Sequence, residues 1–372
     1  MVSGPGRQGS GRIVLDARPL QTASALRGIG TYVRCLFDAM LTEGYGSRLG
    51  LLLDGGLERP ELPGGDYVIF RIRRRYHGRF APYEDAVALP SDLARIAPRA
   101  FHGTTLSLPG RAPCPLVVTL HDLIPWALGG RQLLGERLRY RLGRAALPRA
   151  GIVIAPSASV AGDATRLAGV SPDRIRVIPE GIDPHLRRVE GASGRRWGID
   201  RPFLVYVGAL DARKDPAALL HAWRVARDAG ADCELVVAGA GGKQAPSAMG
   251  AARRLGYLPA GELASLLSAA ACLVFPSRHE GFGLPVLEAM ACGCPVVAYR
   301  NSSIPEAAGD VATLVDDGDA AALGRAAAAY VLDPERAERA KSQGIRRAAG
   351  FTWKRAARAT IAAYREVAGD HR

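Results

Sequence analysis

The chain has 372 residues, of which 48% are apolar and 23% are charged; these are ordinary proportions for a globular protein, and the length suits two domains. No run of 18 apolar residues is present, so the sequence predicts no membrane-spanning helix. The first residues lack the apolar stretch of a secretory signal. We therefore expect residues 1–11 to be flexible and the protein to be cytoplasmic.

The formal net charge is +13, and only four of the 49 basic residues are Lys. Nucleic-acid binding is one explanation, and the arginine-rich segment 71–75 beside Tyr76 and Phe80 is its best evidence. No nucleic-acid motif accompanies this segment, and an excess of Arg over Lys is typical of a GC-rich genome. We expect no nucleic-acid partner. The six cysteines show no zinc-ligand spacing, which predicts free thiols and no metal site.

Predicted strands alternate with helical patterns along the whole chain. Apolar runs that are buried on both faces and separated by helices are typical of parallel, doubly wound sheets. The predicted fold class is therefore α/β, with two doubly wound domains. The strands are expected at 12–17, 49–54, 67–72, 116–122, 151–157 and 175–183 in the first half, and at 203–210, 234–241, 271–277 and 295–299 in the second half.

Residues 131–150 form a basic, helical-looking segment that carries six arginines among regularly spaced leucines. Such a face could rest on anionic lipid or hold an anionic acceptor. It is equally compatible with an ordinary surface helix, which is the interpretation we favour. Peripheral contact with a membrane is kept as an alternative.

The domain boundary is expected at 184–202, a charged segment with glycines and no periodicity. This places a first domain at 12–183 and a second at 203–352. At the C-terminus, apolar residues recur at helical spacing from Trp353 to Val367, behind Thr352 as a possible N-cap. The apolar stripe of this helix requires a surface to cover.

Two cations follow the strand expected at 203–210. Asp215 fits a helix N-cap and Pro216 the first helical position, so Arg213 and Lys214 lie just ahead of a helix N-terminus. That end of a helix already carries partial positive charge, so two cations there favour the presence of an anion. The alternative is a solvated surface pair. We interpret the pair as a phosphate site.

The stretch EGFGLPVLE places Glu280 after another strand and Glu288 about one turn inside a short helix that begins near Pro285. Gly281 and Gly283 allow close approach of the backbone to a ligand. At helical rise, the two glutamates would be roughly 12 Å apart. A retaining glycosidase needs its carboxylates about 5 Å apart, so these are not an acid and nucleophile pair. They fit two hydroxyl-binding groups at the ends of one extended ligand.

The first half offers two weaker signals. Gly28 and Gly30 precede a helical pattern, but the third glycine of a dinucleotide motif is missing. His121 and Asp122 follow the strand expected at 116–122, at the edge where ligands of such sheets bind. The sequence is equally compatible with a structural and with a catalytic role for His121.

These stretches together resemble the family 4 retaining glycosyltransferases of the GT-B architecture. The resemblance covers Ile13 to about Tyr364 and is strongest at 206–223 and 276–310; HDLIP and RGIGTYV are similar to a mannosyltransferase-like branch. It implies two Rossmann-like domains facing across a cleft, with residues 353–372 crossing back to a first, acceptor-binding domain. The second domain would bind the nucleotide sugar. One departure is Glu180, where the family usually has Asn or another neutral residue.

The resemblance implies that His121 and Glu280 are catalytic residues, with His121 near the anomeric centre and Glu280 at the donor sugar. Arg213 and Lys214 would hold the diphosphate and Glu288 the ribose hydroxyls. The full set of implied donor-binding residues is Gly28, Gly30, Gly208, Arg213, Lys214, Tyr257, Leu258, Glu280, Gly281, Phe282, Gly283, Leu284 and Glu288.

The implied activity is metal-independent transfer of a hexose from a nucleotide-diphosphate sugar, with retention and without a cofactor. GDP-mannose is favoured over UDP- or dTDP-sugars, and the acceptor would be a glycan, a lipid-linked molecule or a small secondary metabolite. The alternatives are a sugar-nucleotide epimerase of the same architecture and a non-catalytic nucleotide-sugar-binding protein. An NAD-dependent oxidoreductase is disfavoured, because G-x-G-x-x-G does not follow the first strand.

Overall fold

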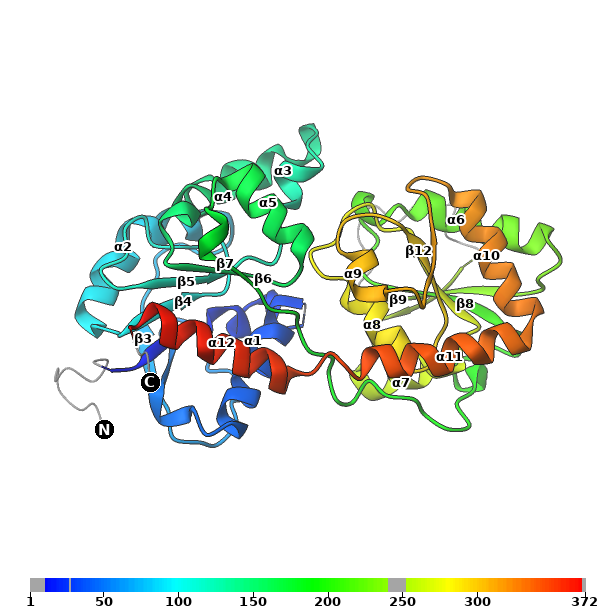
Figure 1. Cartoon of the computed structure of the whole chain (residues 1–372), viewed down its shortest axis with the longest axis horizontal. Helices are drawn as coiled ribbons and strands as arrows, with labels where there is room; N and C mark the ends of the chain where they lie inside the picture. The colour runs from blue at the N-terminus through cyan, green and yellow to red at the C-terminus, as the bar shows by residue number, and fades with distance from the viewer. Residues whose placement is uncertain (1–10, 27, 240–251, 370–372) are drawn as a thin grey trace. The chain divides into compact units, whose positions relative to one another are not determined.

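The protein is represented by a computed structural model that describes residues 11–26, 28–239 and 252–369. The chain divides into two compact units (Figure 1). Unit 1 comprises the chain up to Gly181 and again from Trp353 onward, and unit 2 runs from Ile182 to Thr352. The expected flexible N-terminus lies outside the described residues except for Gly11.

Unit 1 is built on a seven-stranded sheet in the order β3-β2-β1-β4-β5-β6-β7, in which every pairing among the described residues is parallel. Its strands are β1 (Ile13–Asp16), β2 (Leu49–Asp54), β3 (Val68–Ile72), β4 (Ala100–Gly103), β5 (Leu116–Thr119), β6 (Ile152–Ala155) and β7 (Ile175–Val177). Its helices are α1 (Gly28–Thr42), α2 (Ala81–Ile96), α3 (Ile124–Ala127), α4 (Leu134–Ala146), α5 (Ala158–Ala168) and α12 (Trp353–Val367).

Both faces of the unit 1 sheet are covered, which explains the continuous apolar runs of its strands. In β1, Leu15 joins a core cluster with α1 and α12, whereas Val14 joins a cluster on the opposite face with α2 and α5. In β6, Ile154 and Val153 divide in the same way. The alternation follows from the two-residue period of a strand. In sheets of this kind, ligands bind beyond the carboxyl ends of the strands.

Helix α12 packs beside α1 and against β5 and β6, so the C-terminal segment belongs to unit 1 (Figure 1). Trp353 and Tyr364 are buried there. The Tyr364 hydroxyl lies 2.6 Å from Nδ1 of His102 in β4. The predicted C-terminal helix and its return to the first domain are confirmed.

Unit 2 repeats the plan with a six-stranded parallel sheet in the order β10-β9-β8-β11-β12-β13, as far as the described residues extend. Its strands are β8 (Phe203–Val207), β9 (Glu234–Ala238), β10 (Arg253–Gly256), β11 (Cys272–Phe275), β12 (Val296–Tyr299) and β13 (Thr313–Val315). Its helices are α6 (Pro216–Asp228), α7 (Ala260–Ala269), α8 (Leu284–Ala291), α9 (Ile304–Ala308), α10 (Ala320–Leu332) and α11 (Pro334–Ala348). The predicted α/β class with two doubly wound domains is confirmed.

Three strands, β4, β10 and β13, were not predicted. Strand β4 is short and β13 has only three residues, while β10 begins with two arginines at the edge of its sheet, so none carries a long apolar run. The segment expected as a linker, 184–202, also differs. Leu186 and Ile199 are buried in the core of unit 2, so this segment is part of that unit.

None of the helices in the described ranges is both long and apolar enough to cross a bilayer. The four cysteines at 233, 272, 292 and 294 are buried and free. Burial raises the pKa of the Cys233 thiol to about 11 and, with a smaller contribution from Glu288, that of Cys292 to about 12. These thiols therefore stay protonated and pack as small apolar groups.

Candidate functional site

The loop between β8 and α6 is shaped by two aspartates. The Asp211 side chain accepts a hydrogen bond from Lys214 N at 3.2 Å, which closes a short 3₁₀ turn. Asp215 then caps α6 by accepting from Ala218 N at 3.1 Å, while its own φ is 47°. The predicted N-cap and the proline that follows it are confirmed. Arg213 and Lys214 are thereby fixed directly ahead of the helix.

Glu280 lies against these two cations. Its Oε1 accepts from Lys214 Nζ and Ser277 Oγ, and it lies 3.2 Å from Arg213 Nη1. Burial alone would raise the pKa of Glu280, but the charges of Lys214 and Arg213 and the two hydrogen bonds outweigh it and lower that pKa. The anion that the sequence argument required for the cations is therefore supplied by the chain itself, and no ligand is needed to account for them.

Lys214 is buried, with a side chain that is 8% exposed. Burial lowers its pKa, and the Arg213 charge lowers it further, against the opposing effect of Glu280. The ammonium group also lies 4.7 Å from the centre of the Phe275 ring in β11. A cation held between a carboxylate and an aromatic face is fixed in position. Arg213, Lys214 and Glu280 are called the charged triad below.

The backbone of Glu280 is held by the segment after β12. Its N–H donates to Ser302 Oγ at 2.9 Å, and its carbonyl accepts from Ser303 Oγ at 3.0 Å. Asn301 Nδ2 donates to the carbonyl of Ser277 at 3.1 Å. The sequence analysis gave no role to Asn301, Ser302 and Ser303. Their position at the carboxyl end of the neighbouring strand is the signal that would have found them.

The glycine loop after Glu280 leads directly into α8. Gly283 has φ 93°, a conformation that favours glycine, and a side chain there would meet Ile304 at 3.0 Å. Helix α8 begins at Leu284, and Glu288 lies half-buried one turn later. The Phe282 side chain is buried in the unit 2 core and lies edge-on to Phe351.

Other predicted donor contacts lie along the same edge. Gly208 follows β8 and has φ 139°. Gly239 follows β9, and it packs so closely on Gly208 that a side chain at Gly239 would lie 2.3 Å from the Gly208 carbonyl. Tyr257 and Leu258 follow β10; Tyr257 is 58% exposed, whereas Leu258 packs against the core. The carboxyl edge of the unit 2 sheet therefore carries the charged triad, the glycine loop and an exposed aromatic ring.

In unit 1, Gly28 and Gly30 do not precede the helix, as the sequence analysis expected, but form the first turn of α1. A side chain at Gly30 would lie 2.3 Å from the Ser24 carbonyl, whereas nothing lies within 4 Å of one at Gly28. Gly30 is thus required by the close packing of the preceding turn against the helix.

His121 follows β5 and faces Glu180, which follows β7. Its Nδ1 lies 3.1 Å from Glu180 Oε1, and the two rings of His121 and Tyr32 meet edge to face at 4.7 Å. The buried Nε2 atom has no hydrogen-bond partner in the described part of the chain. Sequence reasoning named His121 but did not connect it with Glu180.

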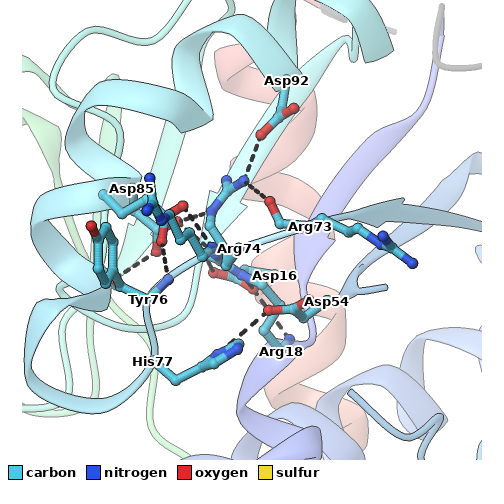
Figure 2. Close-up of polar contacts among 12 residues, drawn as sticks. Asp16, Arg18, Asp54, Arg73, Arg74, Tyr76, His77, Asp85 and Asp92 are labelled. Carbon is cyan, nitrogen blue, oxygen red and sulfur yellow. Dashed lines mark hydrogen bonds and ion pairs between the residues drawn. The ribbon is translucent and has the colours of Figure 1, made fainter. Parts of the chain in front are cut away.

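Within the arginine-rich segment 71–75, Arg74 belongs to a separate ion-pair network at the edge of the unit 1 sheet (Figure 2). Arg74 bonds to Asp85 and Asp92, each at 2.7 Å, and is only 4% exposed. Arg18 bonds to Asp85 and Asp16, also at 2.7 Å. Burial would raise the pKa of Asp85, but the Arg18 charge and the hydrogen bonds lower it. Arg74 therefore links the segment that follows β3 to α2, and it is not a surface cation.

Among the residues that the structure describes, no group of three or more His, Cys, Asp or Glu side chains is arranged to hold a metal ion.

Two family models match the chain. One, described as "Glycosyl transferases group 1", matches residues 194–347, and the other, described as "Glycosyltransferase Family 4", matches residues 26–186. O-antigen chain mannosyltransferase B of Escherichia coli is 33% identical over 173 residues, which are 44% of this chain and 45% of that protein. D-inositol 3-phosphate glycosyltransferase of Frankia alni is 35% identical over 245 residues, 58% of each chain. The chain therefore spans about half the length of these relatives.

The fold is also found in solved structures. Sucrose-phosphate synthase from Thermosynechococcus elongatus has a TM-score of 0.79 at 23% identity, covering 95% of this chain and 98% of that one. HepE of Anabaena, solved in complex with UDP-glucose, has a TM-score of 0.67 at 18% identity, covering 96% and 98%. At these identities the likeness is one of fold.

Proposed function

We propose that this chain, which belongs to the family 4 glycosyltransferases, transfers a hexose from a nucleotide-diphosphate sugar to an acceptor hydroxyl with retention of anomeric configuration. The observation that carries the proposal is the charged triad. Arg213 and Lys214 lie at the carboxyl edge of the sheet, just ahead of the N-terminus of α6, where Glu280 and Asp211 hold them in place. A diphosphate is the ligand that such a group favours.

In the proposed reaction, negative charge develops on the diphosphate as the bond to the sugar breaks. Arg213 and Lys214 stabilise this charge in place, because both are fixed before the ligand arrives. These cations take the part that a metal ion has in other transferases. The leaving phosphate accepts the proton of the acceptor hydroxyl, which enters from the same face, so no protein base is invoked.

The sugar and ribose ends of the donor are assigned to the segment that follows β11. Glu280 and the backbone of Gly281 and Gly283 would bind sugar hydroxyls, and Glu288 in α8 would bind those of the ribose. Glu280 would then share Lys214 with the diphosphate. A carboxylate that already accepts three hydrogen bonds on one oxygen keeps its second oxygen for a ligand.

We propose GDP-mannose as the donor, supported by the similarity to a mannosyltransferase over 173 residues. A UDP-sugar is the second candidate, since HepE of the same fold was solved with UDP-glucose. Nucleotide release measured with each donor, with and without an acceptor glycan, separates the possibilities. Release that requires an acceptor supports transfer, conversion of the donor alone indicates an epimerase, and no turnover with any donor indicates a binding protein.

Binding of the nucleotide tests the site directly. We expect Lys214→Ala and Glu288→Ala each to raise the Kd for the nucleotide diphosphate about tenfold or more, because a hydrogen bond to a charged group is worth about 1.5–3 kcal/mol. Calorimetric titration measures the effect, and Lys341→Ala in α11 is the matched control. Unchanged affinity in both site variants would overturn the assignment.

We further propose a lipid-linked acceptor and peripheral contact with an anionic membrane. Leu134 and Leu138 on α4 are about half exposed, as is Phe80. Arg139 joins the two segments by donating to the Gly78 carbonyl at 3.0 Å. The surface formed with the neighbouring arginines is called the basic apolar surface; it comprises Tyr76, Phe80, Leu134, Leu138, Arg75, Arg79, Arg139 and Arg141. Apolar side chains among arginines are suited to an interface of anionic lipid.

Flotation with vesicles tests this contact. We expect binding to phosphatidylglycerol vesicles and little binding to phosphatidylcholine vesicles, since each Arg near an anionic surface contributes about 1 kcal/mol. Leu134→Gln with Leu138→Gln should weaken the binding about tenfold or more, whereas Leu332→Gln, an equally exposed leucine of unit 2, should not. Equal binding to both vesicle types, or none, would contradict the proposal.

A further inference from the structure

The pair formed by His121 and Glu180 has features that a simple surface ion pair lacks. Glu180 is 5% exposed, and in the described ranges its ion-pair partner is His121, at 3.1 Å. Burying a carboxylate is costly unless it is paired, so its place here needs a reason.

The geometry fixes which nitrogen of His121 carries a hydrogen. An ionised carboxylate only accepts hydrogen bonds, so Nδ1, which faces Glu180, must donate. In the neutral imidazole, Nε2 is then the acceptor. This is the atom that is buried without a hydrogen-bond partner in the described part of the chain. It is therefore set to accept a hydrogen bond from a hydroxyl group of a ligand.

The imidazole of His121 also packs against Tyr32. Tyr32 presents its ring to His121, and its hydroxyl lies 2.7 Å from Thr119 Oγ1. Thr119 in turn lies 2.8 Å from Nε2 of His102. The ring that packs on His121 is thus anchored to two strands of the sheet. Between Tyr32 and Glu180, the imidazole has little freedom to rotate or flip.

We propose that Glu180 is a positioning residue for sugar transfer: it keeps a hydrogen on Nδ1 of His121 and so presents Nε2 as an acceptor to a substrate hydroxyl. The inference rests on the proposed transferase function. The inference goes beyond that function by assigning a role to Glu180, which the proposed reaction does not use. Glu180 acts through His121 and does not itself touch the substrate.

The test uses Glu180→Gln, His121→Ala and the double variant in the full-length protein. The Gln side chain keeps the size but can donate as well as accept, so it no longer enforces one tautomer. We expect Glu180→Gln to lower kcat/KM about 10- to 100-fold, as for carboxylates that orient a functional histidine elsewhere. The loss should lie mainly in kcat, and the double variant should be no slower than His121→Ala. Glu366→Gln, which breaks an exposed ion pair with Arg176 in the same unit, is the matched control and should retain full activity.

A second measurement does not depend on turnover. The ¹⁵N shifts of His121 should report the Nδ1–H tautomer in the wild type and a mixture in Glu180→Gln. An unchanged spectrum would overturn the role of Glu180. So would an equal fold-loss of activity when Glu180→Gln is introduced into the wild type and into the His121→Ala variant. If the wild type transfers no sugar, the proposed function fails, while the spectrum still decides whether Glu180 sets the tautomer.

Discussion

At the scale of single residues, Asp215 both stabilises α6 as its N-cap and adopts an unfavourable backbone conformation. It caps α6, and it adopts φ 47°, a conformation that costs most residues about 1–2 kcal/mol and that Asp tolerates better than most. Its carboxylate also lies 2.8 Å from Arg278. The sequence predicted the cap from the Asp-Pro pair. The unusual φ was not predictable, because it depends on how the preceding 3₁₀ turn meets the helix.

We therefore expect Asp215→Ala to lower the free energy of local opening of α6 by about 2–3 kcal/mol, the sum of a lost cap and an alanine at positive φ. Asp319 caps α10 at φ −81°, so Asp319→Ala should cost only the cap, about 1 kcal/mol. Hydrogen exchange of the two helices, followed by mass spectrometry, measures both values. Equal losses in the two helices would show that the backbone conformation of Asp215 carries no cost.

At the scale of elements, α12 is joined to the sheet of unit 1 through His102. This histidine is fully buried between Tyr364 of α12 and Thr119 of β5. Burial lowers its pKa to about 3. The sequence predicted the helix from its apolar stripe. It gave no sign of His102, because β4 was not predicted.

The lowered pKa of His102 predicts an acid-labile unit 1. The unfolded chain binds a proton at this histidine below about pH 6.5, but the folded unit does not until about pH 3. Stability from this group is therefore complete above pH 6.5 and is lost as the pH falls toward 3, by about 2 kcal/mol at pH 5. Urea unfolding at several pH values should show a shallower pH dependence in His102→Gln than in the wild type.

Two controls belong to this measurement. His221→Gln removes an exposed histidine of α6 and should leave the pH dependence as it is in the wild type. Tyr364→Phe removes the hydrogen bond to His102 but keeps the titrating group, so it should lower stability at every pH without flattening the curve. A wild-type pH dependence that persists in His102→Gln would refute the assignment to this residue.

At the scale of the whole molecule, the sequence predicted the central strands of both sheets because apolar residues fill both of their faces. It missed the polar edge strand β10, since an edge position needs no apolar run. In the site, Arg213, Lys214 and Glu280 were each named, but their mutual pairing was not. Residues 66 positions apart meet only because β8 and β11 are neighbours, which a local pattern cannot reveal.

The discontinuity of unit 1 has a consequence for the order in which the protein is made. The unit 2 segment, from Ile182 to Thr352, leaves the ribosome as one uninterrupted stretch and can close its core at once. Unit 1 starts before unit 2 in the chain, but its core also needs the buried Trp353 and Tyr364 of α12, which are made only after the whole of unit 2. During synthesis, the earlier half of the chain is therefore the later one to finish folding and the more dependent on protection from aggregation.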